Sequence, residues 1–233
     1  MQKKNYNFVL YTAAISFIIF ALLHVILSWS FNESFYKGEH SLIKLNNLSI
    51  SEYIGITDEQ LDELTSFTLN YLKDSNATLD KQMMIKGKLR EVFNEDEKAH
   101  MVDVKRLCAN SRYVCLLSLV IYLFCMFIII KNKLFDDLFK TQIKVYKIFG
   151  LFLLMLILWI IIDFNSFWNF FHHIFFAGND LWLLDLRKDI LIMIVPPEFF
   201  FHLVGIIVIC FILLLFVYLI VLKFLKEGII RLI

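Results

Sequence analysis

The sequence predicts an all-α membrane protein with four transmembrane helices and a mainly helical extracytoplasmic domain between the first two of them. Of the 233 residues, 59% are hydrophobic, whereas a soluble domain averages about 45–50%. Four apolar runs approach the roughly 20 helical residues that a bilayer core requires. Only two prolines and seven glycines are present, so long linkers are not expected. The net charge of +1 gives no reason to expect nucleic acid as a partner.

The first apolar run, Phe8–Ser30, could be a cleaved signal peptide or a retained transmembrane helix. It is longer than the hydrophobic region of about 7–15 residues in a cleaved signal peptide, and no clear small-residue cleavage site follows it. We therefore favour a retained helix, and residues 1–30 form the N-terminus and first span. The predicted segments after it are an extracytoplasmic domain (31–112), a second span (113–130), a cytoplasmic loop (131–145), a third span (146–171), an extracytoplasmic loop (172–198), a fourth span (199–222) and a cytoplasmic tail (223–233).

The distribution of basic residues predicts the orientation, because cytoplasmic segments carry an excess of Lys and Arg. Lysines occur at the N-terminus, between the second and third spans, and in the C-terminal tail. Segment 31–112 is also basic, but its acidic residues and its length weaken its influence. We expect a multi-pass protein of the cell membrane with both termini in the cytoplasm.

The extracytoplasmic segment is too long for a structureless loop. Thr57 and Gln60 have the spacing of a capping box, and apolar residues follow at helical intervals, which predicts a helix over 58–73. Asn94 gives a second cap signal, before a helix that leads toward the second span. Between the two helices, Leu89–Phe93 fits either a short strand or a helical turn.

Cysteine usage and known motifs indicate neither a cofactor nor a metal. The four cysteines lie in or beside apolar runs without a CxxC pair, which favours buried thiols over a disulfide framework or a zinc site. The sequence contains no HExxH, no serine elbow and no glycine-rich phosphate loop. We therefore expect any chemistry to depend on ordinary side chains.

Three of the six histidines are not expected to take part in catalysis. His24 and His202 lie in apolar spans, where a lone histidine more often makes a structural hydrogen bond than a catalytic one. His40 lies in a polar stretch and is expected on the solvated surface.

His100 and His172 are the best catalytic candidates, and both are expected on the outer side. On a helix, Asp96, Glu97 and Asp103 can share the face of His100, where a carboxylate could orient the imidazole and raise its pKa. The alternative is an ordinary solvated helix face. If this helix ran straight into the second span, His100 would stand about 20 Å above the membrane. We therefore predict a bend or break near Ala109–Ser111, with the outer domain folded over the end of the third span.

Asp163 and the aromatic residues around His172 form a second candidate region. Asp163 is expected inside the outer leaflet, where an acidic residue suggests a functional site, although a helix-packing contact is the alternative. An unbroken helix would put Asp163 and His172 on opposite faces, so we do not pair them. Trp168 and Trp182 belong to an aromatic group that is typical of a membrane interface and could also line a pocket for an acyl chain.

Five stretches of the sequence carry motifs that mix several residue types. They are Glu97-x-x-His100-Met101-x-Asp103-Val104-Lys105-x-Leu107, Phe171-His172-x-x-Phe175-Phe176, Gly178-Asn179-Asp180-x-Trp182, Asp189-x-Leu191-Ile192 and Pro197-x-x-Phe200. Together they resemble the bacterial lipoprotein intramolecular transacylases, which are four-span enzymes of Gram-positive bacteria with a large outer segment after the first span. The resemblance covers nearly the whole chain.

The resemblance implies a reaction and a histidine dyad. Family members move an acyl chain within a diacylglyceryl-modified lipoprotein, from the sn-2 ester to the α-amine of the N-terminal cysteine, and produce a lyso-form lipoprotein. His100 and His172 match the two family histidines, and the spacing to the following phenylalanines favours His172 over His173. The implied partners are this lipoprotein and membrane lipid, while the oligomeric state stays open.

The chemistry suggests roles for these residues. We expect His172 to act as the base and His100 as its partner or acid, with backbone amides, Lys105 or a protonated imidazole stabilising the oxyanion. The competing hypothesis is a non-enzymatic membrane module that binds lipid or a partner protein through its outer domain.

Overall fold

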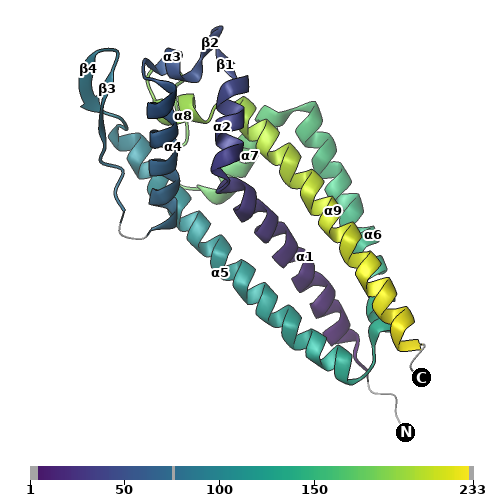
Figure 1. Cartoon of the computed structure of the whole chain (residues 1–233). Coiled ribbons are helices and arrows are strands. Elements are labelled where there is room, and N and C mark those ends of the chain that lie inside the picture. The colour runs from purple at the N-terminus through teal and green to yellow at the C-terminus, as the bar shows by residue number, and fades with distance from the viewer. Residues whose placement is uncertain (1–4, 75–76, 231–233) are drawn as a thin grey trace. The chain divides into compact units, whose positions relative to one another are not determined.

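A computed structural model describes residues 5–74 and 77–230 (Figure 1). Its described residues form mostly helices with two short β-hairpins, which confirms the predicted fold class. The chain divides into two compact units. The bundle unit comprises residues 1–27, 111–163 and 206–233, and the hairpin unit comprises residues 28–110 and 164–205.

The bundle unit is built from the four helices of the described residues that are long and apolar enough to cross a membrane. These are α1 (Asn7–Ser30), α5 (Glu95–Lys131), α6 (Phe135–Ile162) and α9 (Pro197–Ile230), of which α1, α5 and α9 extend into the hairpin unit. Ala13 and Ala21 of α1 are fully buried, which fits close packing of helix backbones at small residues in a membrane. The chain is therefore an integral, multi-pass membrane protein.

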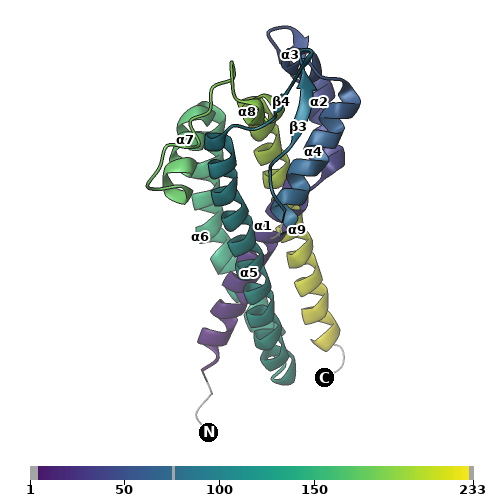
Figure 2. The same ribbon diagram turned by 90° about the vertical axis from the view of Figure 1, so that its left-hand side faces the viewer.

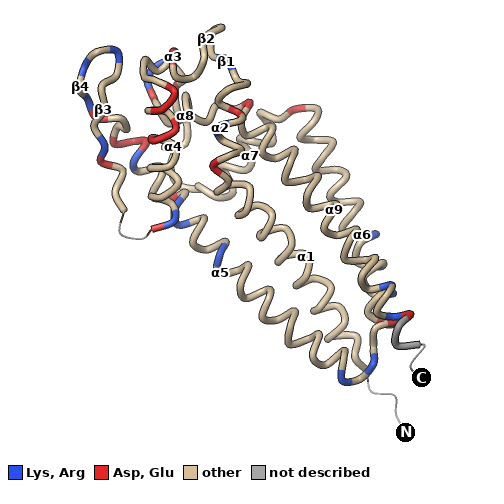
Figure 3. The backbone as a smooth tube through the Cα atoms, viewed as in Figure 1, with Lys and Arg blue, Asp and Glu red and all other residues tan. Residues whose placement is uncertain are grey.

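One end of the bundle unit gathers the basic segments. The Tyr6 hydroxyl donates to Asn132 Oδ1 (2.8 Å), and Lys226 Nζ pairs with Asp136 Oδ1 (2.7 Å). These contacts bring together the start of α1, the α5–α6 turn and the end of α9. Figure 3 shows Lys or Arg positions, in blue, at this end of the helices.

Two predictions about the helices are wrong. The expected third span, 146–171, is divided between α6 and a separate helix, α7 (Phe164–Phe175). Asp163 caps the end of α6 with φ −149° and ψ 82°, because short polar side chains favour helix ends over helix interiors. The predicted break near Ala109–Ser111 does not occur, since α5 is one continuous helix and this stretch contains no proline or glycine to interrupt it.

The hairpin unit contains the remaining elements, which are labelled in Figure 1 and seen from the side in Figure 2. They are α2 (Glu33–Leu42), β1 (Lys44–Leu45), β2 (Leu48–Ser49), α3 (Ile50–Ile54), α4 (Asp58–Lys73), β3 (Gln82–Ile85), β4 (Lys88–Glu91), α7 and α8 (Ile190–Ile194), together with the N-terminal parts of α5 and α9. Strands β1 and β2 pair antiparallel, as do β3 and β4.

Both predicted helix starts in this unit are confirmed. Gln60 N donates to Thr57 Oγ1 (3.2 Å) and Thr57 N donates to Gln60 Oε1 (2.9 Å), so α4 begins with the predicted capping box. Asn94 and Glu97 exchange an equivalent pair of hydrogen bonds at the start of α5. Each cap satisfies amide groups that have no partner within the helix.

Candidate active site

His100 and His172 lie against each other inside the hairpin unit. Their ring centroids are 6.2 Å apart with an angle of 31° between the planes, and each residue is only 7% exposed. The pair is close enough to share one substrate group or one bridging water.

The separation of α7 from α6 explains how the two histidines meet. His172 belongs to the same compact unit as His100 because the helix of the third span ends at Ile162, before the histidine. Proximity therefore requires no break in α5. Of the adjacent pair in α7, His172 is buried and faces His100, whereas His173 is exposed and makes an edge contact with Trp182 at 5.2 Å.

His172 is held in one orientation and one tautomer. Its Nδ1 lies 2.7 Å from the Trp168 carbonyl oxygen. A carbonyl can only accept a hydrogen bond, so Nδ1 carries the hydrogen and Nε2 keeps its lone pair. The Trp168 ring lies edge-on to the imidazole at 4.8 Å, and the Trp182 ring stacks on it at 4.7 Å and 27°. The lone pair on Nε2 is the feature that a general base requires.

Burial keeps both imidazoles neutral at neutral pH. His100 precedes the expected second span, and burial, reinforced by the charge of His172, lowers the pKa of His100 to about 4 against the opposing effect of Asp103. Burial also lowers the pKa of His172, while its hydrogen bond to the Trp168 carbonyl opposes this shift and the charge of His173 adds to it. The carbonyl hydrogen bond makes His172 the better proton acceptor of the two.

Aromatic rings enclose the pair. Phe176 is buried and lies 5.1 Å from the ring of His100, and the Trp168 ring stacks with Phe171 at 5.2 Å and with Phe200 at 4.4 Å. Such a surrounding excludes water and accommodates an apolar chain. The rings in contact with this cluster are Trp168, Phe171, Phe175, Phe176, Trp182 and Phe200.

Three other predicted site residues make their contacts with groups other than the histidine pair. Asp103 accepts hydrogen bonds from Arg106 and from the Asn179 side chain. Lys105 donates to the Ala77 carbonyl (3.3 Å) and lies 3.9 Å over the Tyr71 ring, so its ammonium group is already engaged. Asp163 caps α6 in the bundle unit and is not part of the hairpin unit.

Sequence reasoning missed a buried carboxylate network beside the site. Glu97, 1% exposed, accepts hydrogen bonds from the backbone amides of Asn94 and Leu191, both at 2.7 Å. Asp189, also buried, accepts from the Asn94 side chain at 2.8 Å. The network ties the segment before α8 to the start of α5. The cap signal at Asn94 was visible in the sequence, but its link to Asp189 spans 95 positions.

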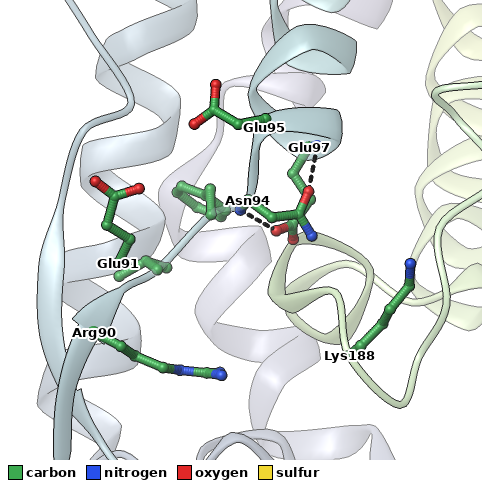
Figure 4. Close-up of a pocket in the computed structure, with 8 residues that line it drawn as sticks. Arg90, Glu91, Asn94, Glu95, Glu97 and Lys188 are labelled. Carbon is green, nitrogen blue, oxygen red and sulfur yellow. Dashed lines mark hydrogen bonds between the residues drawn. The ribbon is translucent and has the colours of Figure 1, made fainter.

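A pocket of about 330 Å³ lies next to this network but contains neither histidine of the pair. Figure 4 shows the reciprocal hydrogen bonds of Asn94 and Glu97 in its wall. Its lining residues are Arg90, Glu91, Val92, Phe93, Asn94, Glu95, Glu97 and Lys188.

The surface prediction for His40 is wrong, whereas a structural role fits His202. His40 is buried, and its Nε2 lies 3.0 Å from the Ile194 carbonyl oxygen. His202 Nδ1 lies 2.6 Å from an oxygen of Glu39. The polar stretch around His40 forms the amphipathic helix α2, whose buried face contains this histidine.

Comparisons with solved structures identify the same fold. The chain is similar to the membrane integral lipoprotein intramolecular transacylase Lit from Bacillus cereus, with 20% identity, coverage of 95% of both chains and a TM-score of 0.78. Two single-histidine variants of that protein also match. The arginine variant has 22% identity, covers 94% of this chain and 90% of its own, and has a TM-score of 0.68. The alanine variant has 20% identity, covers 96% and 93%, and has a TM-score of 0.68.

Comparison with curated proteins gives no match. The model of the family described as lipoprotein intramolecular transacylase Lit matches residues 3–200, which is well over half of the sequence. The chain therefore belongs to the lipoprotein intramolecular transacylase family.

Proposed function

We propose that this acyltransferase moves an acyl chain from the sn-2 ester of a diacylglyceryl-cysteine lipoprotein to the α-amine of the same cysteine, with His172 as base and His100 as its partner. The observation that carries the proposal is the buried histidine pair, in which the Trp168 carbonyl fixes His172 with a free lone pair on Nε2. Family membership identifies an enzyme and so argues against the non-enzymatic membrane module.

The first step forms the new carbon–nitrogen bond. An α-amine has a pKa of about 7.7–8.0, so part of it is neutral at neutral pH, and this neutral form has the lone pair that attacks. His172 Nε2 removes a proton as the nitrogen attacks the ester carbonyl carbon, and the carbonyl π electrons move to oxygen. Both reacting groups belong to one substrate, so a correctly held conformer contributes up to about 7–11 kcal/mol.

The second step breaks the ester bond. The oxyanion re-forms the carbonyl, the bond to the glyceryl sn-2 oxygen breaks, and that oxygen takes the proton from His172. We assign to His100 a hydrogen bond to this departing oxygen, since its Nδ1 is buried without a hydrogen-bond partner among the described residues. Every proton that the histidine removes is returned, and no cofactor is required.

The reaction is proposed for the outer face of the membrane. The lysine-rich segments meet at one end of the bundle unit, and a concentration of basic residues marks the cytoplasmic side. In this orientation both termini are cytoplasmic, and the hairpin unit is extracytoplasmic, where lipoproteins reside.

The test is tandem mass spectrometry of lipoprotein N-termini from cells with and without this chain. The product is an isomer of the substrate, so fragment ions, together with loss of the reactive α-amine, must be measured. We expect N-acylated lyso-form lipoprotein only with the wild-type chain. His100→Ala and His172→Asn should abolish it, whereas His24→Ala in the bundle unit should not. Unchanged product from both active-site variants would refute the assignment.

A further inference from the structure

Trp182 contains a buried hydrogen-bond donor without an acceptor among the described residues. Its indole Nε1 is buried and has no hydrogen-bond partner among the described residues. Buried N–H groups are almost always paired in folded proteins, so an unpaired one at a functional site calls for an explanation. An indole N–H is a donor only, which means that the missing group is an acceptor.

The position of the indole identifies where that acceptor would lie. The Trp182 ring stacks on the His172 imidazole, with centroids 4.7 Å apart and 27° between the planes. Because the amine that His172 deprotonates attacks the ester carbonyl, the carbonyl oxygen must come close to this imidazole. The unpaired donor therefore belongs to a ring that stacks directly on the proposed base.

The loop around Trp182 is built to hold the ring in place. Gly178 adopts φ +109°, a conformation that residues with a Cβ rarely adopt. The side-chain oxygen of Asn179 accepts from Leu181 N (3.2 Å), and its amide group donates to Asp103 on α5 (3.1 Å). The turn is thus anchored to the helix of His100, which gives Asp103 and Asn179 positioning roles.

We propose that the Trp182 indole N–H is the oxyanion donor of the transacylation. This inference rests on the proposed function and adds a specific group to it. When the amine attacks and the carbonyl π electrons move to oxygen, the oxyanion accepts a hydrogen bond from Nε1, and the bond weakens again when the carbonyl re-forms. Lys105, the side-chain donor expected from the sequence, already has the Ala77 carbonyl and the Tyr71 ring as partners.

The kinetic test uses the full-length protein in lipid nanodiscs and a synthetic diacylglyceryl lipopeptide. Trp182→Phe keeps an aromatic ring against His172 but removes the donor. We expect kcat to fall about 10²–10³-fold, the usual effect of losing one oxyanion donor, with little change in KM. Trp29→Phe, a tryptophan outside the site, is the matched control and should leave kcat unchanged. Full kcat in Trp182→Phe would overturn the inference.

A binding measurement keeps the inference testable if Trp182→Phe folds poorly. The probe is a phosphonate analogue of the tetrahedral intermediate, added to wild-type protein with ¹⁵N-labelled tryptophan indoles. We expect one indole N–H resonance, assigned to Trp182, to shift downfield as the phosphonate oxygen accepts its hydrogen bond. An unchanged Trp182 resonance in the saturated complex would overturn the inference.

The two proposals fail in different ways. If His172→Asn is inactive while Trp182→Phe retains full kcat, the oxyanion assignment is wrong and the proposed function stands. If wild-type protein forms no N-acyl lipopeptide, the proposed function itself is wrong.

Discussion

Replacement of Glu97 by alanine removes one acceptor from two backbone amides at once. Glu97 is 1% exposed and accepts from Asn94 N and Leu191 N at 2.7 Å each. A hydrogen bond to a charged group contributes about 1.5–3 kcal/mol. The bond from Asn94 N is also the cap of α5, so the loss of the cap is not counted separately. We expect Glu97→Ala to lower the free energy of unfolding by about 3–6 kcal/mol.

Thermal unfolding of the purified protein in detergent measures this effect. For a chain of this size, 1 kcal/mol corresponds to about 2–4 °C in Tm, so a decrease of roughly 6–24 °C is expected. Glu95→Ala is the matched control on the same helical turn, because the Glu95 side chain is 88% exposed and pairs only at the surface with Lys98. Surface pairs contribute about 0–1 kcal/mol. Equal Tm values for the two variants would refute the argument.

Three further predictions follow from burial and backbone geometry. Histidine NMR should show His100 and His172 titrating below pH 6.5, with the pKa of His100 near 4. The free energy of unfolding should fall as the pH is lowered from 6.5 to 4, because the unfolded imidazoles bind protons in this range and the buried ones do not. Titration at or above pH 6.5 would contradict the assigned environment. Ala13→Leu, at a fully buried position of α1, should cost about 1–3 kcal/mol by overpacking in a thermal unfolding assay, whereas Ile15→Leu, 49% exposed, should be neutral. Gly178→Ala, at φ +109°, should reduce kcat by displacing the loop that carries the indole, and unchanged lipopeptide turnover would show that the loop tolerates the strain.

Signals close together in the sequence predicted local structure well. The capping boxes at Thr57 and Asn94 depend on residues three positions apart, and both α4 and α5 begin where these signals indicate. The four apolar runs likewise predicted the four long helices, since the hydrophobic thickness of a membrane imposes a minimum length.

Elements that depend on distant partners or on short stretches were mostly not predicted, although the strand alternative for Leu89–Phe93 overlaps β4. The hairpins have strands of only two to four residues, too short for alternation to stand out, and their turns use positive φ at Asn46–Asn47 and Lys86–Gly87. The end of α6 at Asp163 falls inside an apolar stretch, where hydropathy alone predicts continuation.

The same limits apply to the candidate site. The motifs around His100 and His172 indicated the pair, and its proximity is observed, but the catalytic roles stay a prediction. The unpaired indole of Trp182 could not be foreseen, because a missing hydrogen bond is visible only when all neighbours are in place.

The mutual influence of the two imidazoles has a consequence for how the site exchanges protons. Each positive charge disfavours a second one across the 6.2 Å between the rings, so the pair can store one proton at a time. A site with this capacity is suited to a reaction in which one proton leaves one atom of the substrate and returns to another. A transfer completed within the site needs no hydrogen-bonded path to bulk solvent, so it can take place entirely inside the water-excluding aromatic surroundings of the pair.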